Sequence, residues 1–312
     1  MEASGGQRIE WHDVGPDVRR AIESHLGAAV VDARNQPGGF SPGLAARCAL
    51  GDGRRAFVKA VSPDQNPHAC RIHRREAEVA AQLPSDLPVP RLLHVVDDGH
   101  WVALVFEEVE GVQPAEPWTH DQLAVVLPAL QRFAERTTPT PAPGLQTVEA
   151  RYGAAFRGWR RLAAGDADPS SYGPDVVAAI DRLAGLEEPW AAAASGDTLL
   201  HTDLRADNLL ITPTGDVVLV DWPWACTGAA FVDLAMLLPS VGLGGPDPAS
   251  VIEAHHLFAD VDPDALVSVL AALAGFFVRQ SLDPAPPGLP AIRAFQRAQA
   301  QVALGWLLPR IT

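Results

Sequence analysis

The chain has 312 residues, enough for one large domain or two lobes of unequal size. Its 38 acidic and 24 basic residues give a net charge of -14. That balance argues against nonspecific binding to nucleic acid or an anionic membrane, because both require a basic face, and it is compatible with a cationic small-molecule substrate. The cysteines, Cys48, Cys70 and Cys226, are odd in number and widely spaced, which argues against a disulfide framework or a zinc knuckle.

The N-terminal residues and the apolar stretches of the chain predict where the protein resides. The N-terminal residues contain no apolar signal core, and no stretch of about 18 apolar residues is free of charge and proline. We therefore expect a soluble cytoplasmic protein without a membrane span.

Residues 1–110 predict a small lobe built on an antiparallel sheet. Apolar spacing and turn residues predict helices over 16–26 and 68–83 and strands over 28–32, 44–50, 55–61, 91–96 and 102–106. The loop over 36–43, QPGGFSPG, joins the first two strands. The next hairpin leads to Lys59, the only lysine among the 24 basic residues. A glycine-rich loop is weak evidence alone, but together with a compact point charge it suggests a lid over phosphates.

The helix over 68–83 carries a candidate partner for Lys59. Glu76 shares a helical stripe with Ala80 and Leu83, and Glu78 faces away from that stripe. An inward carboxylate requires a partner, and Lys59 is favoured. The alternative is a surface salt bridge from Glu76 to Arg71 or Arg75.

The segment 107–111, EEVEG, predicts a hinge whose backbone could meet an adenine edge. Beyond it residues 111–312 predict a larger, mainly helical lobe, and a Pro-rich loop covers 137–145. Helices are expected over 119–136, 147–165, 174–194, 229–240, 248–258, 262–281 and 289–309.

The stretch from His201 to Trp222, HTDLRADNLLITPTGDVVLVDW, carries the chemistry. Asn208 and Asp221 lie at the outer ends of a predicted hairpin, so pairing of its strands brings them together. Two converging oxygen ligands suit Mg²⁺, and Asp203 is placed to accept the proton of a hydroxyl. The competing interpretation is that Asp and Asn here only form turns.

HTDLRADN followed by LVDW resembles the aminoglycoside phosphotransferase and choline kinase group of the protein-kinase-like fold. The resemblance extends over nearly the whole chain and implies an α+β, two-lobed fold, with a five-stranded antiparallel sheet and helix in the small lobe. It also implies ATP or GTP and Mg²⁺ between the lobes. The glycine-rich loop would cover the phosphates, Lys59 would contact them, and Glu76 would hold Lys59.

The resemblance assigns roles residue by residue. The Glu107 carbonyl and the Val109 N–H would meet the purine with Phe106 behind it, and Asp203 would be the base. The expected nucleotide-binding residues are Gly38, Gly39, Gly43, Lys59, Glu76, Phe106, Glu107 and Val109, and the metal ligands are Asn208 and Asp221. The catalytic residues are Asp203 and, from its place inside the loop rather than from the resemblance, Arg205.

Three residues of this region have two interpretations each. His201 is expected to brace the catalytic loop rather than to transfer a proton. Asp233 is expected to tie the following helix to that loop rather than to bind substrate. Arg205 could approach the γ-phosphate or face solvent.

The sequence also departs from the family pattern. Thr202 and Asp207 stand where the family often has Gly, and Trp222-Pro223-Trp224 stands where a second acidic residue is usual. The two tryptophans could wall an acceptor pocket or belong to the core. The acidic residues that could meet a cationic acceptor, or simply cap helices, are Glu253, Asp260, Asp262 and Asp264.

The predicted function is transfer of the γ-phosphate of ATP or GTP to a hydroxyl of an antibiotic such as an aminoglycoside. The alternatives are a kinase of an ordinary metabolite (an amino alcohol or a sugar) and a non-catalytic nucleotide-binding protein. Only eleven residues separate Asp221 from Asp233, which leaves no room for the peptide platform of a protein kinase.

Overall fold

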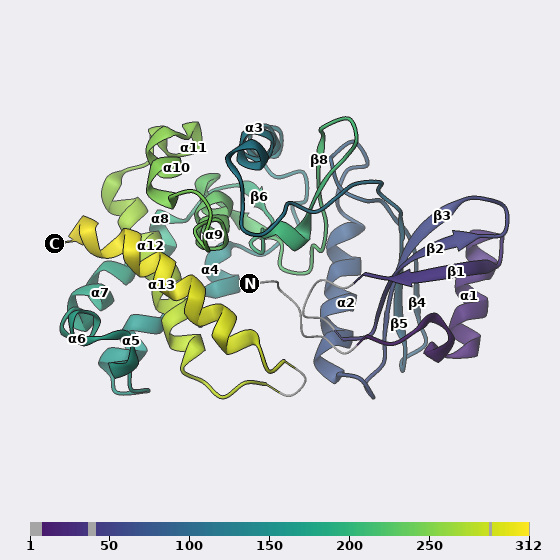
Figure 1. Ribbon diagram of the computed structural model, residues 1–312, viewed down its shortest axis with the longest axis horizontal. Helices are drawn as coiled ribbons and strands as arrows, with labels where there is room; N and C mark the ends of the chain where they lie inside the picture. Colours follow the sequence, from purple (N-terminus) through teal and green to yellow (C-terminus); the bar gives the residue numbers. More distant parts are fainter. Residues whose placement is uncertain (1–7, 37–41, 287–288, 312) are drawn as a thin grey trace.

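The computed structural model describes residues 8–36, 42–286 and 289–311 and has two lobes side by side along its long axis (Figure 1). The small lobe holds an antiparallel sheet in the order β1-β2-β3-β5-β4. Its strands are β1 (Val30–Asn35), β2 (Leu44–Leu50), β3 (Arg55–Val61), β4 (Leu92–Asp97) and β5 (Val102–Glu107). The predicted five-stranded sheet is confirmed. The first strand begins two residues later than expected, beside an irregularity between Val30 and Asp32.

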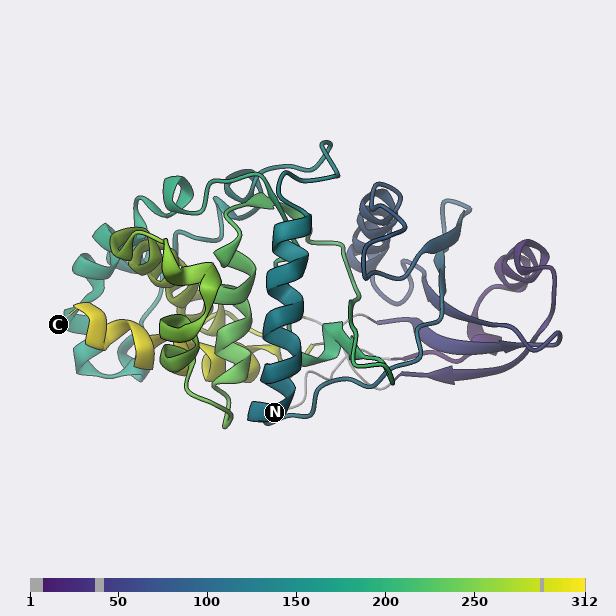
Figure 2. The ribbon, with the colours of Figure 1, turned by 90° about the horizontal axis from the view of Figure 1, so that it is seen from above.

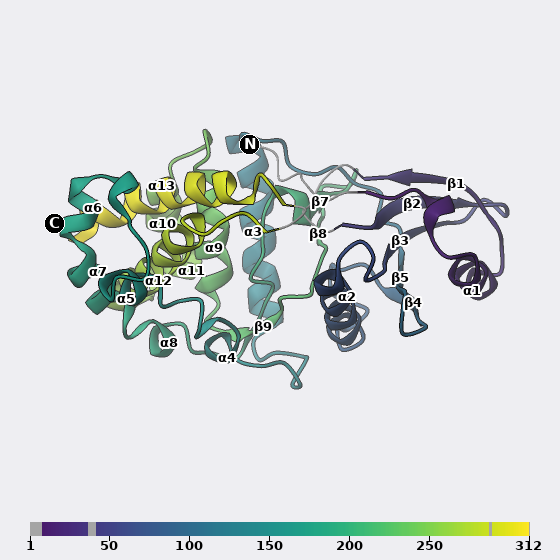
Figure 3. The ribbon, with the colours of Figure 1, turned by 90° about the horizontal axis from the view of Figure 1, so that it is seen from below.

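Successive side chains of β5 point to opposite faces of the sheet, and both faces are apolar. Ala103 and Val105 belong to the cluster around α1 (Pro16–Leu26). Leu104 and Phe106, on the opposite face, belong to the cluster that includes α2 (Pro67–Ala80), as the two-residue period of a strand requires. Figure 3 shows α2 between the sheet and the large lobe, and α1 on the far side. The small lobe therefore presents α2 and its sheet edge to the large lobe.

The large lobe begins with α3 (His120–Arg136), which stands at the edge facing the small lobe (Figure 2). Thr119 caps this helix as predicted: its hydroxyl accepts from the Gln122 N–H at 3.2 Å, and the Gln122 side chain accepts from the Thr119 N–H at 3.0 Å. Two short antiparallel pairs follow, β6 (Thr198–Leu200) with β9 (Cys226–Gly228) and β7 (Leu209–Ile211) with β8 (Val217–Leu219). The second pair is the predicted hairpin.

The predicted long helices over 147–165 and 174–194 are wrong. The chain instead forms short segments: α4 (Val148–Tyr152), α5 (Gly158–Ala163), η2 (Ser170–Tyr172), α6 (Pro174–Ala178), α7 (Ile180–Glu187) and α8 (Trp190–Ala193). Tertiary contacts set these breaks. The buried Glu187 carboxylate caps α5 by accepting from the N–H groups of Trp159 at 3.0 Å and Arg160 at 3.2 Å. A Cβ at Gly158 would lie 2.0 Å from the Gly275 carbonyl oxygen, so α5 packs backbone to backbone.

The rest of the large lobe is helical. Its helices are α9 (Phe231–Val241), α10 (Pro248–Ala254), α11 (His256–Ala259), α12 (Pro263–Ser281) and α13 (Ile292–Ile311); two 3₁₀ turns elsewhere are η1 (Trp11–Asp13) and η3 (Ala206–Asn208). The helix predicted over 248–258 is split at His255, whose backbone is extended and whose Nδ1 caps α11 by accepting from the Leu257 N–H at 3.2 Å. By length and composition α12 is the one described helix apolar enough to cross a membrane, and 61% of its apolar window is buried inside the lobe.

Candidate active site

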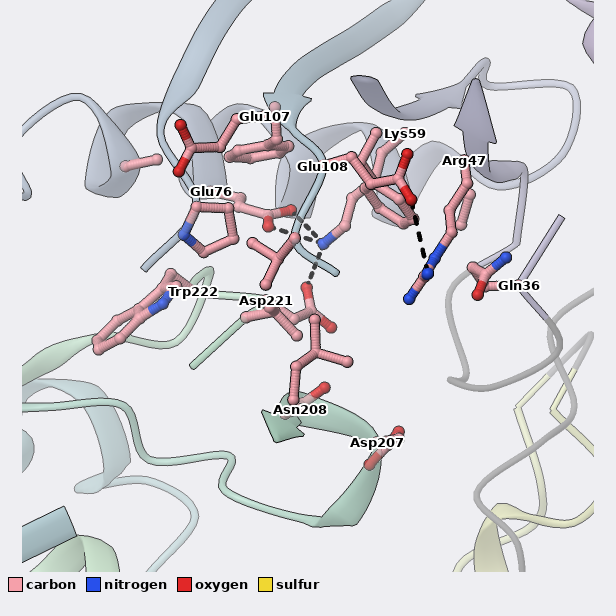
Figure 4. Close-up of a pocket in the computed structure, with 18 of the residues that line it drawn as sticks. Gln36, Arg47, Lys59, Glu76, Glu107, Glu108, Asp207, Asn208, Asp221 and Trp222 are labelled. Atoms are coloured by element: carbon pink, nitrogen blue, oxygen red, sulfur yellow. Dashed lines mark hydrogen bonds and ion pairs between the residues drawn. The ribbon is translucent and has the colours of Figure 1, made fainter. Parts of the chain in front are cut away.

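A cavity of about 560 Å³ lies between the lobes and is lined by both. Lys59 and Glu76 line it from the small lobe, and Asn208 and Asp221 from the large lobe (Figure 4). The volume lies within the range of about 300–1,000 Å³ that is typical of small-molecule sites. The residues expected to bind a nucleotide and a metal therefore converge on one space.

Lys59 is the centre of the ion pairs in this cavity. Its Nζ donates to Glu76 Oε1 at 2.7 Å and Oε2 at 2.9 Å, and to Asp221 Oδ1 at 2.7 Å. Glu76 is 3% exposed, whereas the Glu78 side chain is 66% exposed and pairs with Arg75 at 3.6 Å. The predicted pairing of Glu76 with Lys59 is confirmed, and the surface alternative is wrong.

One ammonium faces two carboxylates here, and the pKa values reflect that imbalance. Burial alone would lower the pKa of Lys59, but Asp221 and Glu76 raise it above its usual value. Burial alone would raise the pKa of Asp221, but Lys59 holds it below the usual range. Burial leaves the pKa of Glu76 raised despite the contact with Lys59. Lys59 and Asp221 therefore carry full charges inside the cavity.

Of the glycine-rich loop over 36–43, the structure describes Gln36, Pro42 and Gly43. Gly38 and Gly39 lie outside the described residues. Gly43 has φ +102, and a Cβ there would lie 2.4 Å from the Ala60 carbonyl oxygen, so the chain needs glycine where it enters β2.

The hinge segment borders the same cavity through Phe106, Glu107 and Val109. Arg55 Nε donates to Glu108 Oε2 at 2.6 Å, and Arg47 Nη1 lies 3.5 Å from Glu108 Oε1, so the sheet holds the hinge in place. Within the described residues the Val109 N–H has no hydrogen-bond partner. The hinge therefore offers a donor for a ligand.

The catalytic loop is held by two buried side chains. His201 Nε2 lies 2.8 Å from the Val220 carbonyl oxygen, and the Asp203 N–H lies 3.2 Å from His201 Nδ1. These contacts require a neutral ring with its proton on Nε2, and burial lowers the pKa of His201 to about 4. The Asp233 carboxylate, on α9, accepts from the N–H groups of His201 and Thr202, both at 2.7 Å. Both residues are in the bracing positions expected of them.

Thr202 occupies a backbone conformation that favours glycine, with φ 62. Its hydroxyl donates to the Trp224 carbonyl oxygen at 2.9 Å and accepts from the Tyr152 hydroxyl at 2.9 Å. These two bonds offset the strain and tie the loop to α4. They account for a threonine where the family often has glycine.

Asp203 makes contacts with both of its neighbours in the loop. Its Oδ1 accepts from Arg205 Nη1 at 2.6 Å, and Asn208 Nδ2 lies 2.7 Å from its carbonyl oxygen and 3.3 Å from its Oδ2. Burial raises the pKa of Asp203 to about 7, although Arg205 opposes the shift. The Arg205 side chain is only 15% exposed, so the interpretation that it faces solvent is wrong.

Asn208 and Asp221 meet as the hairpin prediction requires, because the Val220 N–H donates to the Asn208 carbonyl oxygen at 3.0 Å. Asn208 uses its amide nitrogen on Asp203, and Asp221 uses Oδ1 on Lys59. The remaining oxygens, Asn208 Oδ1 and Asp221 Oδ2, accept no hydrogen bond from any described residue. Two such oxygens beside one cavity fit the oxygen ligands that Mg²⁺ takes.

The two tryptophans after Asp221 differ in their surroundings. Trp222 is 3% exposed, donates to the Leu219 carbonyl oxygen at 2.9 Å and packs against His201 at 4.6 Å between ring centroids. Trp222 therefore belongs to the core beneath the catalytic loop, although its edge borders the cavity. Trp224 is half-buried, and the Arg151 guanidinium lies 4.4 Å from its ring centroid.

Sequence reasoning missed His73 and Asp207, both of which line the cavity. His73 is buried beside Lys59, and burial lowers its pKa to about 4. Its spacing of three from Glu76 on α2 is the signal that would have found it. Asp207 was noted only as a departure from glycine, and nothing local in the sequence says that it pairs with Arg205.

Three comparisons place the chain among known proteins. No curated protein sequence matches it. Among solved structures, an aminoglycoside phosphotransferase from Alicyclobacillus acidocaldarius is 19% identical, with a TM-score of 0.57 over 96% of this chain and 98% of that one. A choline kinase from Streptococcus pneumoniae is 14% identical, with a TM-score of 0.59 over 92% and 98%. A spectinomycin phosphotransferase in complex with AMP is 13% identical, with a TM-score of 0.56 over 92% and 97%.

These likenesses show the fold, which is the two-lobed protein-kinase-like fold expected from the sequence. The sequence profile of the phosphotransferase enzyme family matches residues 39–267, which is more than half of the chain and includes Lys59, the catalytic loop and Asp221. The chain therefore belongs to the phosphotransferase enzyme family and is a phosphotransferase with an alcohol group as acceptor.

Proposed function

We propose that this protein is a Mg²⁺-dependent kinase that transfers the γ-phosphate of ATP to a hydroxyl of a small molecule. The observation that carries the proposal is the convergence of Lys59, Asp221 and Asn208 on one interlobe cavity, with Asp203 bonded to Asn208 beside it. AMP in the related spectinomycin phosphotransferase supports an adenine nucleotide, and GTP is the alternative.

In this proposal the nucleotide lies between the lobes. The Glu107 carbonyl and the unpaired Val109 N–H meet the purine edge, and Phe106 closes the space behind it. Lys59 places its ammonium on the phosphates while Glu76 holds it in position. Asn208 and Asp221 would hold Mg²⁺, which neutralises the charge of the phosphate oxygens. The dividing line between the lobes is placed at residues 110 and 111.

Asp203 is assigned as the base. It accepts the proton of the acceptor hydroxyl as that oxygen bonds to the γ-phosphorus and the bond from phosphorus to the β-phosphate oxygen breaks. A carboxylate with a raised pKa is a better proton acceptor than an ordinary one, which suits this role. Arg205 is assigned to the γ-phosphate, because its guanidinium already lies against Asp203.

The acceptor belongs to one of two classes, an antibiotic such as an aminoglycoside or an ordinary metabolite. The charges beside the catalytic loop favour a metabolite that is not a polycation. Arg151 stacks on Trp224, and Thr202 links Trp224 to α4. Within the described residues Arg151 has no carboxylate partner, so this side of the loop carries an unneutralised positive charge.

The acidic residues considered for a cationic acceptor lie elsewhere. Asp262 caps α12 by accepting from the N–H groups of Asp264 and Ala265 at 2.8 and 3.2 Å. α10, which contains Glu253, and α11 lie on the side of α3 and α9 away from the small lobe (Figure 1). These positions support capping and surface roles rather than substrate binding.

The test is a phosphorylation screen. Purified protein with Mg²⁺ and either ATP or GTP is incubated with a mixed panel of aminoglycosides, other antibiotics, amino alcohols and sugars. Mass spectrometry then looks for a gain of one phosphate. A phosphorylated acceptor that disappears with Asp203→Ala supports the proposal. Nucleotide binding without transfer to any panel member would favour the non-catalytic alternative.

A further inference from the structure

Asp207 binds Arg205 through both of its carboxylate oxygens. It is assigned neither as the base nor as a metal ligand. Its Oδ1 accepts from Arg205 Nε at 2.9 Å and its Oδ2 from Arg205 Nη2 at 2.9 Å. A paired, two-bond contact of this kind holds one edge of a guanidinium in place and leaves its other corner for a second partner. The Asp207 side chain is 12% exposed and that of Arg205 15%, so little solvent competes with these bonds.

The remaining nitrogen of Arg205 points at the base. Arg205 Nη1 donates to Asp203 Oδ1 at 2.6 Å, and the Phe295 ring of α13 lies 5.9 Å from the guanidinium carbon. One edge of the guanidinium is thus held by Asp207, while its opposite corner touches Oδ1 of Asp203. Asp207 also lines the interlobe cavity together with Asn208 and Asp221.

The charges of Arg205, Asp203 and Asp207 allow the bond between Arg205 and Asp203 to be exchanged for another. Among its described contacts Arg205 bonds to Asp203 through Nη1 alone and to Asp207 through two other nitrogens, so the bond to Asp203 can be replaced by a bond to another anion without releasing Asp207. A γ-phosphate entering the cavity carries more negative charge than one carboxylate and takes planar guanidinium donors well. Arg205 would then leave Oδ1 of Asp203 open to the hydroxyl that it must deprotonate.

We propose that Asp207 is a positioning residue that holds Arg205 as a pivot, with Nη1 on Asp203 before nucleotide binds and on the γ-phosphate afterwards. This inference rests on the proposed function, because it needs a nucleoside triphosphate in the cavity. It explains why this chain has Asp rather than Gly before the metal-binding Asn208: the residue is required to orient an arginine two positions away. Asp207 acts only through Arg205 and does not touch the substrate.

Binding of ADP and of a non-hydrolysable ATP analogue, each with Mg²⁺, tests the proposal by isothermal titration calorimetry and needs no knowledge of the acceptor. Wild-type protein is expected to bind the analogue more tightly than ADP. Arg205→Gln should reduce that preference about tenfold, since a hydrogen bond to a charged group contributes about that factor or more. Asp207→Asn should remove most of the same preference and leave ADP affinity within about twofold of wild type.

The double variant separates positioning from general disruption. Because Asp207 is proposed to act through Arg205, Arg205→Gln/Asp207→Asn should show the same preference as Arg205→Gln alone. Asp97→Asn is the matched control: Asp97 makes the same two-bond contact with Arg74 at 2.7 and 2.9 Å, and neither residue lines the cavity. It should leave the preference unchanged, and thermal melts confirm that each variant is folded.

The outcomes are distinct. If neither nucleotide binds to wild-type protein, the proposed function fails and the pivot fails with it. If both bind and Asp207→Asn keeps the wild-type preference, the pivot alone is wrong. The pivot is also wrong if Asp207→Asn weakens ADP and the analogue equally, because that result indicates a structural role.

Discussion

Lys59 of β3 and Asp221 of the large lobe, 162 positions apart in the chain, are joined by an ion pair of 2.7 Å. The pair spans the cleft between the lobes and leaves one oxygen of Asp221 without a described hydrogen bond. It makes the cleft a preformed site in which the cation for the phosphates and the carboxylate for the metal are already opposed. Substitutions at this pair and at the contacts around it have measurable consequences.

Lys59→Met should lower kcat/KM by roughly 10²-fold or more, because it removes a preorganised charge from a site with little competing water. The substitution also leaves buried Glu76 without its cation. Steady-state kinetics with ATP as the varied substrate measures the loss, and circular dichroism checks that the lobe is folded. Activity within a few-fold of wild type would contradict the assignment of Lys59 to the phosphates.

Asp203→Asn should reduce kcat by roughly 10²–10⁴-fold, the usual contribution of a general base. Asparagine keeps the contact with Asn208 and approximately the same volume, so Mg²⁺-ATP binding should change little. Single-turnover kinetics, with calorimetry for the nucleotide, separates the two effects. A variant that keeps wild-type kcat would remove Asp203 from the role of base.

Stability should fall as the pH drops below about 6.5, because His73 and His201 are buried in the neutral form. Burial lowers the pKa of each to about 4 from the usual value of 6.5. The unfolded chain therefore binds protons that the folded chain does not, and the stabilisation present above pH 6.5 is lost towards pH 4. Each histidine contributes a slope of up to about 1.4 kcal/mol per pH unit.

Urea unfolding at intervals between pH 7.5 and 4.5 measures this dependence. His73→Gln should reduce the slope by up to about 1.4 kcal/mol per pH unit, the contribution of one histidine, and His25→Gln, at an exposed position on α1, serves as the control. An identical slope in His73→Gln and wild type would show that His73 does not resist protonation.

Gly43→Ala should destabilise the small lobe more than Gly53→Ala. Both glycines have positive φ, +102 and +88, so both substitutions bring backbone strain of about 1–3 kcal/mol. Only at Gly43 would the new Cβ also meet backbone, 2.4 Å from the Ala60 carbonyl oxygen, whereas at Gly53 nothing lies within 4 Å. The difference between the two unfolding free energies isolates the steric contribution. Equal losses would mean that β2 shifts to accommodate the methyl group.

Local patterns in the sequence were sufficient to predict much of the secondary structure of this protein. The strands over 44–50 and 55–61, the capped helix α3 and the hairpin that joins Asn208 to Asp221 all follow from apolar period and turn residues. The pairing of Lys59 with Glu76 followed from one helical stripe and the absence of any other lysine. The helices between α3 and β6 did not follow, because the buried carboxylate of Glu187 and the contact of Gly158 with Gly275 set their ends.

The sequence alone determined the reaction class, since Asp203, Asn208, Asp221 and Lys59 carry it through residue type and spacing. Only the tertiary structure decided how those groups are held. It buried Arg205 between Asp203 and Asp207 rather than in solvent, placed Trp222 in the core, and set Arg151 on Trp224 beside the catalytic loop. The physical reason is that ion pairs and stacking between side chains depend on distances across elements, whereas spacing along the chain specifies only which face of one element a residue occupies.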